Sequence, residues 1–238
     1  MPHRTPFPLT GHAMKLAIFD LDDTLIDFAS TRQVAYGCLG QVLDREGIDS
    51  KTFLQACAEV DFALFSRFTQ GEITRAEYRN RRFSEPFTVM GLPSKLELVE
   101  QLNTLFMDCV NDSPLLYDDT RKVLAQLRAA GIHTAILTNG PSDGQRRKLK
   151  ATGLADAVDH VAIGEEMGFS KPRPEAFHTV VKRFSVGNAE ALMIGDSPEL
   201  DYDAALGAGL KAVLLDRDAR HGNTGRVSIR TLEGVLAK

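Results

Sequence analysis

The 238-residue sequence predicts an α/β protein, in which a parallel sheet carries helices on both faces and a helical segment is inserted after the first strand. Short apolar runs alternate with amphipathic helical patterns along most of the chain, as strands alternate with crossover helices in a parallel sheet. One long interval, 28–113, has no clear strand and repeats apolar residues at helical spacing. These patterns separate a sheet-forming core from an inserted helical bundle.

Each expected strand is a short apolar run that ends in a polar or glycine-containing turn. In a parallel sheet, ligands bind beyond the carboxyl ends of the strands, so the residues at those ends are the candidates for a site. The expected strands lie at 15–20, 132–138, 157–164, 189–195 and 210–215, and the expected helices between them at 118–130, 142–152, 174–184 and 201–208.

The helical interval is interrupted near 47–50, 69–74 and 90–94, which predicts about four helices within 28–113. The core is then formed by 14–27 and 114–238. The first 13 residues include three prolines and two histidines, which favours a loose tail at 1–13.

The composition excludes several classes of partner. A net charge of −4 and a pI of about 5.9 give no bulk attraction for a phosphate backbone, so we expect no nucleic acid polymer. No apolar run approaches the roughly 20 residues that span a bilayer, so we expect no membrane partner. The three widely spaced cysteines are typical of free thiols in a reducing cytoplasm. We therefore expect a cytoplasmic protein, with a monomer and a homodimer both open.

The first expected strand ends in two aspartates, Asp20 and Asp22. If the chain stays extended there, both carboxylates project to the same side and repel each other. A divalent cation such as Mg²⁺ would relieve that repulsion, since oxygen ligands suit it. One carboxylate could then attack a phosphorus atom while the other transfers a proton. An acidic helix cap would explain the same residues without any chemistry.

Three further expected strands or turns supply polar residues in the same way. Thr138 and Asn139 precede a helix and together with Gly140 form an anion site, or a plain helix cap. Lys171 lies before Pro172 and is either a neutralising ammonium or an ordinary surface lysine. Asp196 and Asp201 follow the fourth strand and are either metal ligands or an acidic helix cap.

Taken in order, these segments resemble the four motifs of the haloacid dehalogenase (HAD) superfamily. The first motif is Asp20-Leu21-Asp22-Asp23-Thr24, the second is Thr138, the third is Lys171 before a proline, and the fourth runs from Gly195 to Asp201. The resemblance covers about 15–215, and it implies a Rossmann-like core with a helical cap at the first insertion site.

The resemblance also implies a role for each motif residue. Asp20 is expected to be the nucleophile that forms an aspartyl-phosphate, and Asp22 the acid that protonates the leaving group and then activates water. The phosphoryl oxygens are expected to contact Thr138, Asn139 and Lys171. The implied Mg²⁺ ligands are Asp20, Asp196 and the backbone carbonyl of Asp22, with Thr24 and Asp201 in supporting positions.

Asp22 indicates which branch of the superfamily the sequence resembles. Dehalogenases lack this acid, because cleavage of a carbon–halogen bond needs no protonated leaving group. The sequence therefore favours a phosphoric monoester hydrolase acting on a small phosphorylated metabolite. A phosphomutase or a dehalogenase on the same scaffold remains open, as does a non-catalytic phosphate-binding protein.

Within the expected cap, a cluster of arginines follows the helix break at 71–74. Arg79 and Arg82 are the candidates for contact with an anionic leaving group, and Arg75 and Arg81 lie beside them. A solvated basic helix face would explain the same cluster.

Overall fold

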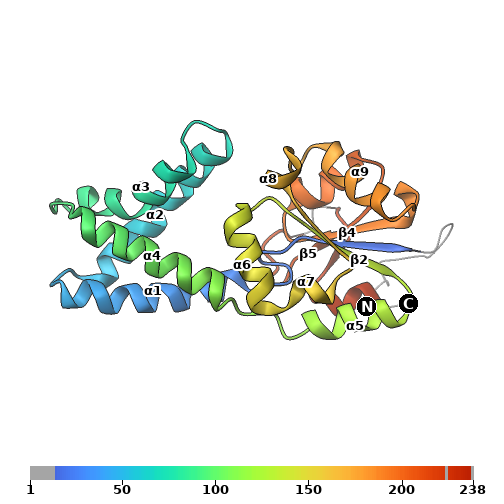
Figure 1. Cartoon of the computed structure of the whole chain (residues 1–238), viewed down its shortest axis with the longest axis horizontal. Helices are drawn as coiled ribbons and strands as arrows, with labels where there is room; N and C mark the ends of the chain where they lie inside the picture. The colour runs from blue at the N-terminus through green and yellow to red at the C-terminus, as the bar shows by residue number, and fades with distance from the viewer. Residues whose placement is uncertain (1–13, 223–224, 237–238) are drawn as a thin grey trace. The chain divides into compact units, whose positions relative to one another are not determined.

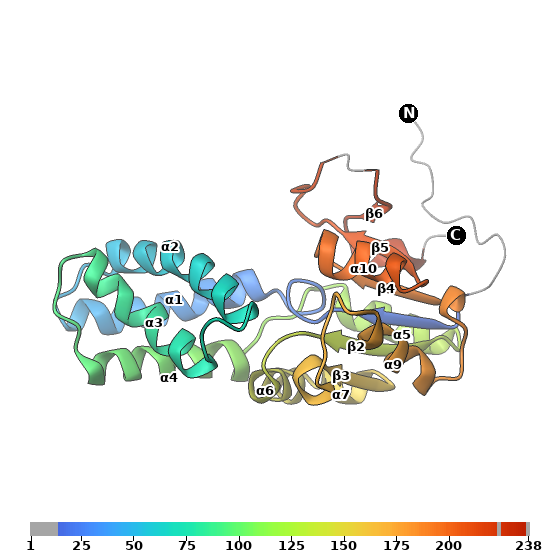
Figure 2. The ribbon, with the colours of Figure 1, turned by 90° about the horizontal axis from the view of Figure 1, so that it is seen from above.

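The computed structural model describes residues 14–222 and 225–236 and divides into two compact units. One unit is formed by Met1–Phe28 and Pro114–Lys238 and contains the sheet, and the other is the helical unit Ala29–Ser113 (Figures 1 and 2). The tail expected at 1–13 lies outside the described residues. No helix in the described part of the chain is both long and apolar enough to cross a membrane.

The sheet of the first unit has six strands in the order β3-β2-β1-β4-β5-β6, and every neighbouring pair is parallel. The predicted α/β fold class is therefore confirmed. The chain moves to one side of β1 for β2 and β3, and to the other side for β4, so the order reverses at β1. The strands are β1 (Leu16–Phe19), β2 (His133–Thr138), β3 (His160–Ile163), β4 (Ala191–Gly195), β5 (Lys211–Leu215) and β6 (Ser228–Ile229).

Helices cover both faces of the sheet, because alternate strand residues point to opposite sides. Ala17 and Phe19 pack with the apolar residues of α5, α6 and α7, whereas Leu16 and Ile18 pack with those of α9 and α10. All four of these β1 residues are fully buried. The helices are α5 (Thr120–Ala129), α6 (Ser142–Thr152), α7 (Leu154–Ala157), α8 (Gly164–Met167), α9 (Pro174–Arg183) and α10 (Ala204–Gly207).

Several short elements differ from the sequence prediction. The strand β6 has two residues and the helices α7 and α8 have four each, which is too short for a recognisable period. The helix expected at 201–208 begins earlier, as a π-helical segment η2 (Pro198–Asp203) that leads into α10. Ser197 caps this segment by accepting a hydrogen bond from the backbone N–H of Leu200 at 3.1 Å. Two 3₁₀ segments, η1 (Asn188–Glu190) and η3 (Leu232–Leu236), complete the unit.

Four helices form the second unit, which confirms the predicted helical insertion (Figure 2). Thr74 and Glu77 begin the third helix with reciprocal hydrogen bonds between side chain and backbone, 3.2 and 2.7 Å long. Aromatic rings join neighbouring helices, as where Phe83 meets Phe106 edge-on at 5.6 Å. The helices are α1 (Phe28–Arg45), α2 (Ser50–Thr69), α3 (Arg75–Val89) and α4 (Leu96–Asp112).

The two connections that lead to and from the helical unit are hydrogen-bonded to each other within the first unit. The backbone N–H of Asp27 donates to the carbonyl of Leu115 at 2.8 Å, and Ile26 forms an antiparallel bridge with Leu116. The insertion therefore leaves and re-enters the core at one place.

Arg82 lies inside the helical unit, with 7% of its surface exposed. Its guanidinium donates to Asn103 Oδ1 at 2.6 Å and lies 4.4 Å from the ring centre of Phe106. Burial lowers its pKa, although Tyr78 and Asp61 oppose that change. Arg82 is therefore not part of a solvated basic helix face. Arg79, by contrast, is only partly buried. A contact of Arg79 or Arg82 with a leaving group stays a prediction.

We expect Arg82→Ala to lower the free energy of unfolding by about 2–4 kcal/mol, because it leaves a cavity and removes the donor to Asn103 Oδ1. The matched control is Arg81→Ala on the same helix. Its side chain is 35% exposed and pairs with Glu85, so its loss should cost less than about 1 kcal/mol. Urea unfolding measures both changes, and equal losses would contradict a buried supporting role for Arg82.

Candidate active site

The carboxyl ends of β1, β2 and β4 meet at one edge of the sheet. Phe19, the last residue of β1, pairs with Ile136 of β2 and with Ile194 of β4. The backbone N–H of Asp20 still donates to the carbonyl of Ile194 at 2.9 Å, so Asp20 leaves the strand in a fixed position. This is the edge at which the strand order reverses, where α/β sheets bind their ligands.

Lys171 is a buried ammonium at this edge. Its Nζ lies 2.6 Å from Asp20 Oδ1 and 2.6 Å from Asp201 Oδ1, and only 4% of the residue is exposed. The alternative of an ordinary surface lysine is therefore excluded. A lysine is buried in this way only when its charge is paired.

Three carboxylates gather around that ammonium. Asp20, Asp196 and Asp201 each offer one oxygen, and these oxygens lie within 4.8 Å of one another. Three carboxylates and one ammonium leave two negative charges, which is the charge that one divalent cation neutralises. Gly195 makes this arrangement possible, because a Cβ there would lie 2.2 Å from Asp201 Oδ2. The donor set of clustered carboxylate oxygens therefore fits a hard divalent cation.

The electrostatics of the cluster show the same shortage of positive charge. Burial raises the pKa of Asp20 well above its usual value, and Lys171 opposes this only in part. Burial, with the nearby Asp201 and Asp23, raises the pKa of Asp196 to about 7. Burial pulls the pKa of Lys171 down, but Asp20 and Asp201 together outweigh it and raise that pKa.

The carboxylate of Asp22 lies apart from this cluster. Its Oδ1 accepts from Lys148 Nζ at 2.6 Å and its Oδ2 from Gln145 Nε2 at 2.9 Å. The chain does not stay extended after Asp20. It turns through Asp23 in the left-handed region at φ 58°, and the N–H of Ile26 donates back to the carbonyl of Leu21 at 2.9 Å.

Among the described residues, the acidic cluster therefore consists of Asp20, Asp196 and Asp201, and the side chain of Asp22 is not part of it. The metal contact expected from the backbone carbonyl of Asp22 stays a prediction.

Thr138 and Asn139 both lie at the end of β2, but their side chains make different hydrogen bonds. The hydroxyl of Thr138 accepts from Gln145 Nε2 at 2.6 Å, so its own proton is available to an anion. Asn139 uses both ends of its amide on the backbone of Lys171, at 2.7 and 2.9 Å. That side chain fixes Lys171, which leaves the backbone N–H of Asn139 for any phosphate contact.

Thr24 supports the turn that follows Asp22. Its carbonyl accepts from the guanidinium of Arg217 at 3.2 Å, and its hydroxyl is buried with no hydrogen-bond partner among the described residues. Arg217 also pairs with Asp119 at 2.9 Å, which connects the turn to the N-terminus of α5.

Sequence reasoning missed two residues of the site, Gln145 and Lys148. Both lie on α6, three positions apart, and both are buried although they are polar. Their spacing places them on one face of the helix, beside the buried Leu149. The signal available in the sequence was their spacing beside Leu149, the one large apolar residue of a helix that follows an active-site strand.

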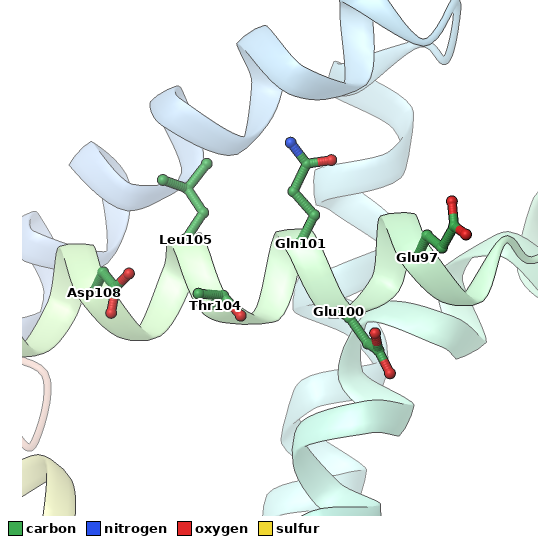
Figure 3. Close-up of a pocket in the computed structure, with 6 residues that line it drawn as sticks. All are labelled: Glu97, Glu100, Gln101, Thr104, Leu105 and Asp108. Atoms are coloured by element: carbon green, nitrogen blue, oxygen red, sulfur yellow. The ribbon is translucent and has the colours of Figure 1, made fainter.

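A pocket lies on the helical unit, away from the strand-end residues in the sequence (Figure 3). Its walls come from one face of α4, and three of its six lining residues are acidic. These carboxylates would repel a phosphate group, so the strand ends remain the candidate site. The lining residues are Glu97, Glu100, Gln101, Thr104, Leu105 and Asp108.

Comparison with known proteins agrees with the fold and the site. Residues 14–209 match the family described as haloacid dehalogenase-like hydrolase, so this chain belongs to that family of hydrolases. The phosphoserine phosphatase of Thermus thermophilus is 32% identical over 228 residues, covering 87% of this chain and 90% of that protein. The glyceraldehyde 3-phosphate phosphatase of Pyrococcus abyssi is 30% identical over 202 residues, covering 84% and 80%.

A solved structure is similar over nearly the full length of this chain. The magnesium-bound HAD-hydrolase YfnB of Bacillus subtilis superposes with a TM-score of 0.76 at 26% sequence identity. The match covers 94% of this chain and 97% of that one. The predicted family is therefore confirmed.

The raised pKa of Asp196 predicts that its charge destabilises the metal-free protein. Since that pKa is about 7 in the fold and ordinarily 3.8, the cost is absent below about pH 4 and complete above about pH 7. In EDTA at pH 8, Asp196→Asn should therefore raise the free energy of unfolding by about 1–3 kcal/mol. Urea titrations should show this gain shrinking towards pH 4.5. An equal gain at both pH values would show that charge is not the cause.

Proposed function

We propose that this chain hydrolyses the phosphate monoester of a small metabolite, with Mg²⁺ and through an aspartyl-phosphate on Asp20. The observation that carries the proposal is the placement of Asp20, whose carboxylate lies at a strand end beside a buried ammonium and two further carboxylates. Phosphoryl transfer depends on positioning and charge neutralisation, which is what this arrangement offers. The phosphatase relatives in two organisms support the same reaction class.

In the first half of the reaction, Asp20 attacks the phosphorus atom in line with the ester bond. The bond from phosphorus to the leaving oxygen breaks, and Asp22 gives that oxygen a proton. In the second half, a water molecule gives its proton to Asp22 and attacks the aspartyl-phosphate. Free phosphate leaves, and the Asp20 carboxylate and the protonated Asp22 are restored. Lys171 and the hydroxyl of Thr138 hold the phosphoryl oxygens throughout.

The residues that would hold Mg²⁺ are Asp20, Asp196 and the backbone carbonyl of Asp22, with Asp201 in support. When bound, the cation neutralises charge on the phosphoryl group and on the carboxylates around it. With Lys171 as its cation, the cluster of three carboxylates keeps two negative charges. This excess of negative charge supports a divalent cation as the partner.

The partner is a small phosphorylated metabolite. The named relatives act on phosphoserine and on glyceraldehyde 3-phosphate, both of them small esters that carry a second polar group. We propose that the helical unit is the cap and selects among esters of this size, with Arg79 and Arg82 as its candidate contacts.

Asp20→Asn should abolish turnover, because an amide cannot form the covalent intermediate. We expect the rate of phosphate release to fall about 10³-fold or more on a panel of phosphoserine, glyceraldehyde 3-phosphate and p-nitrophenyl phosphate. The control is Asp156→Asn, an exposed aspartate of the same unit that should retain full activity. Wild-type-like turnover by Asp20→Asn would overturn the proposed nucleophile.

Removal of divalent cations tests the metal separately. Treatment with EDTA should stop phosphate release, and added Mg²⁺ should restore it. Asp196→Asn should require a higher Mg²⁺ concentration for half-maximal rate, because it removes one anionic ligand. A full rate in EDTA would refute the metal requirement and leave the role of Asp20 standing.

A further inference from the structure

One face of α6 presents two buried polar side chains to the loop that follows β1. Gln145 is 1% exposed and Lys148 is 5% exposed, and they lie three positions apart on the helix. Burial of a lysine is unfavourable unless its charge is paired. Here the pair is Asp22, which lies 126 positions earlier in the sequence.

These two side chains hold both oxygens of the same carboxyl group. Lys148 Nζ contacts Oδ1 at 2.6 Å, and Gln145 Nε2 contacts Oδ2 at 2.9 Å. The ring of Phe28 packs against the ammonium, with its centre 4.5 Å from Nζ. Two donors on two oxygens fix both the position and the rotation of the carboxyl group. Each oxygen keeps a further lone pair for a proton.

The backbone around Asp22 does not provide this restraint by itself. Asp22 lies beyond the end of β1, in a turn that passes through a left-handed residue, so its side chain depends on outside contacts for its direction. General acid–base catalysis requires the acid within hydrogen-bond reach of the leaving oxygen. A displacement of about 1 Å can cost roughly 10²-fold in rate.

Gln145 also connects this carboxyl group to the end of β2. The same Nε2 that contacts Asp22 donates to Thr138 Oγ1 at 2.6 Å. Gly140 provides the space, since a Cβ at that position would lie 2.2 Å from Gln145 Nε2. A single amide thereby sets the distance between the proposed acid and a proposed phosphate contact.

We infer that Lys148 and Gln145 are positioning residues that aim the carboxyl group of Asp22 at the leaving-group oxygen. The inference rests on the proposed function. Neither residue is assigned a contact with the reacting atoms. Lys148 acts through Asp22, and Gln145 acts through Asp22 and also contacts Thr138. A merely structural role would be the alternative, in which the lysine and glutamine only satisfy a buried carboxylate.

Leaving groups of different basicity separate the two roles. Phenyl phosphate and p-nitrophenyl phosphate are similar in shape, but nitrophenolate departs readily without a proton and phenolate does not. The ratio kcat/KM covers the steps up to departure of the alcohol. Misplacement of Asp22 should therefore slow phenyl phosphate selectively, whereas general damage to the site should slow both esters equally.

Lys148→Met keeps the length and apolar stem of the side chain and removes its charge. We expect kcat/KM for phenyl phosphate to fall about 10- to 100-fold. The value for p-nitrophenyl phosphate should fall less than about 3-fold. Lys148→Arg should recover part of the loss, because its guanidinium can again donate to Asp22. Gln145→Met should show the same selectivity with a smaller change, and it tests the inference independently if Lys148→Met fails to fold.

The matched control is Lys150→Met, which changes an exposed lysine on the same helix and should leave both esters unaffected. Thermal unfolding of each variant establishes that the fold is intact. An equal loss on both esters, or no loss at all, would overturn the positioning role. Absence of phosphate release by the wild-type protein from these two esters and from phosphoserine and glyceraldehyde 3-phosphate would instead refute the proposed function itself.

Discussion

The ammonium of Lys171 is the interaction on which the site depends. It lies 2.6 Å from Asp20 and from Asp201, and without it three clustered carboxylates would face one another with no positive charge between them. Two sets of contacts fix the position of Lys171: the hydrogen bonds of Asn139 to its backbone, and the two ion pairs of its Nζ. The ammonium therefore joins the end of β1 to η2, and the backbone of the same residue joins both to the end of β2. One ammonium does not neutralise three carboxylates, and a divalent cation would supply the missing positive charge.

The topology of the sheet explains why these residues meet. All six strands are parallel, so their carboxyl ends lie at one edge, and the reversal of order at β1 opens a place between neighbouring crossovers. Two glycines then allow the side chains to approach. Gly195 makes room for Asp201, and Gly140 makes room for Gln145. The site is therefore formed by the regular sheet together with two positions at which no side chain fits.

The sequence was sufficient for the sheet, the helical insertion and the acidic strand ends, because these depend on local apolar patterns and on the rule that parallel strands share an edge. It was not sufficient for the pairing of side chains. Lys148 and Asp22 are 126 positions apart, and their contact depends on a turn through Asp23 that breaks the extended geometry assumed for Asp20 and Asp22. The early start of η2 depends on the Ser197 cap, which an apolar period does not reveal.

The backbone contacts between Ile26 and Leu116 and between Asp27 and Leu115 affect how such a chain can diverge in evolution. Because the two ends of the insertion are already joined, the sheet does not need the intervening 85 residues of Ala29–Ser113 to keep β1 beside its neighbours. Loop closure depends only weakly on the length of what is enclosed. Segments of other lengths and folds can therefore occupy this position while the chemistry at the strand ends stays the same. The core and the insertion are free to diversify at different rates.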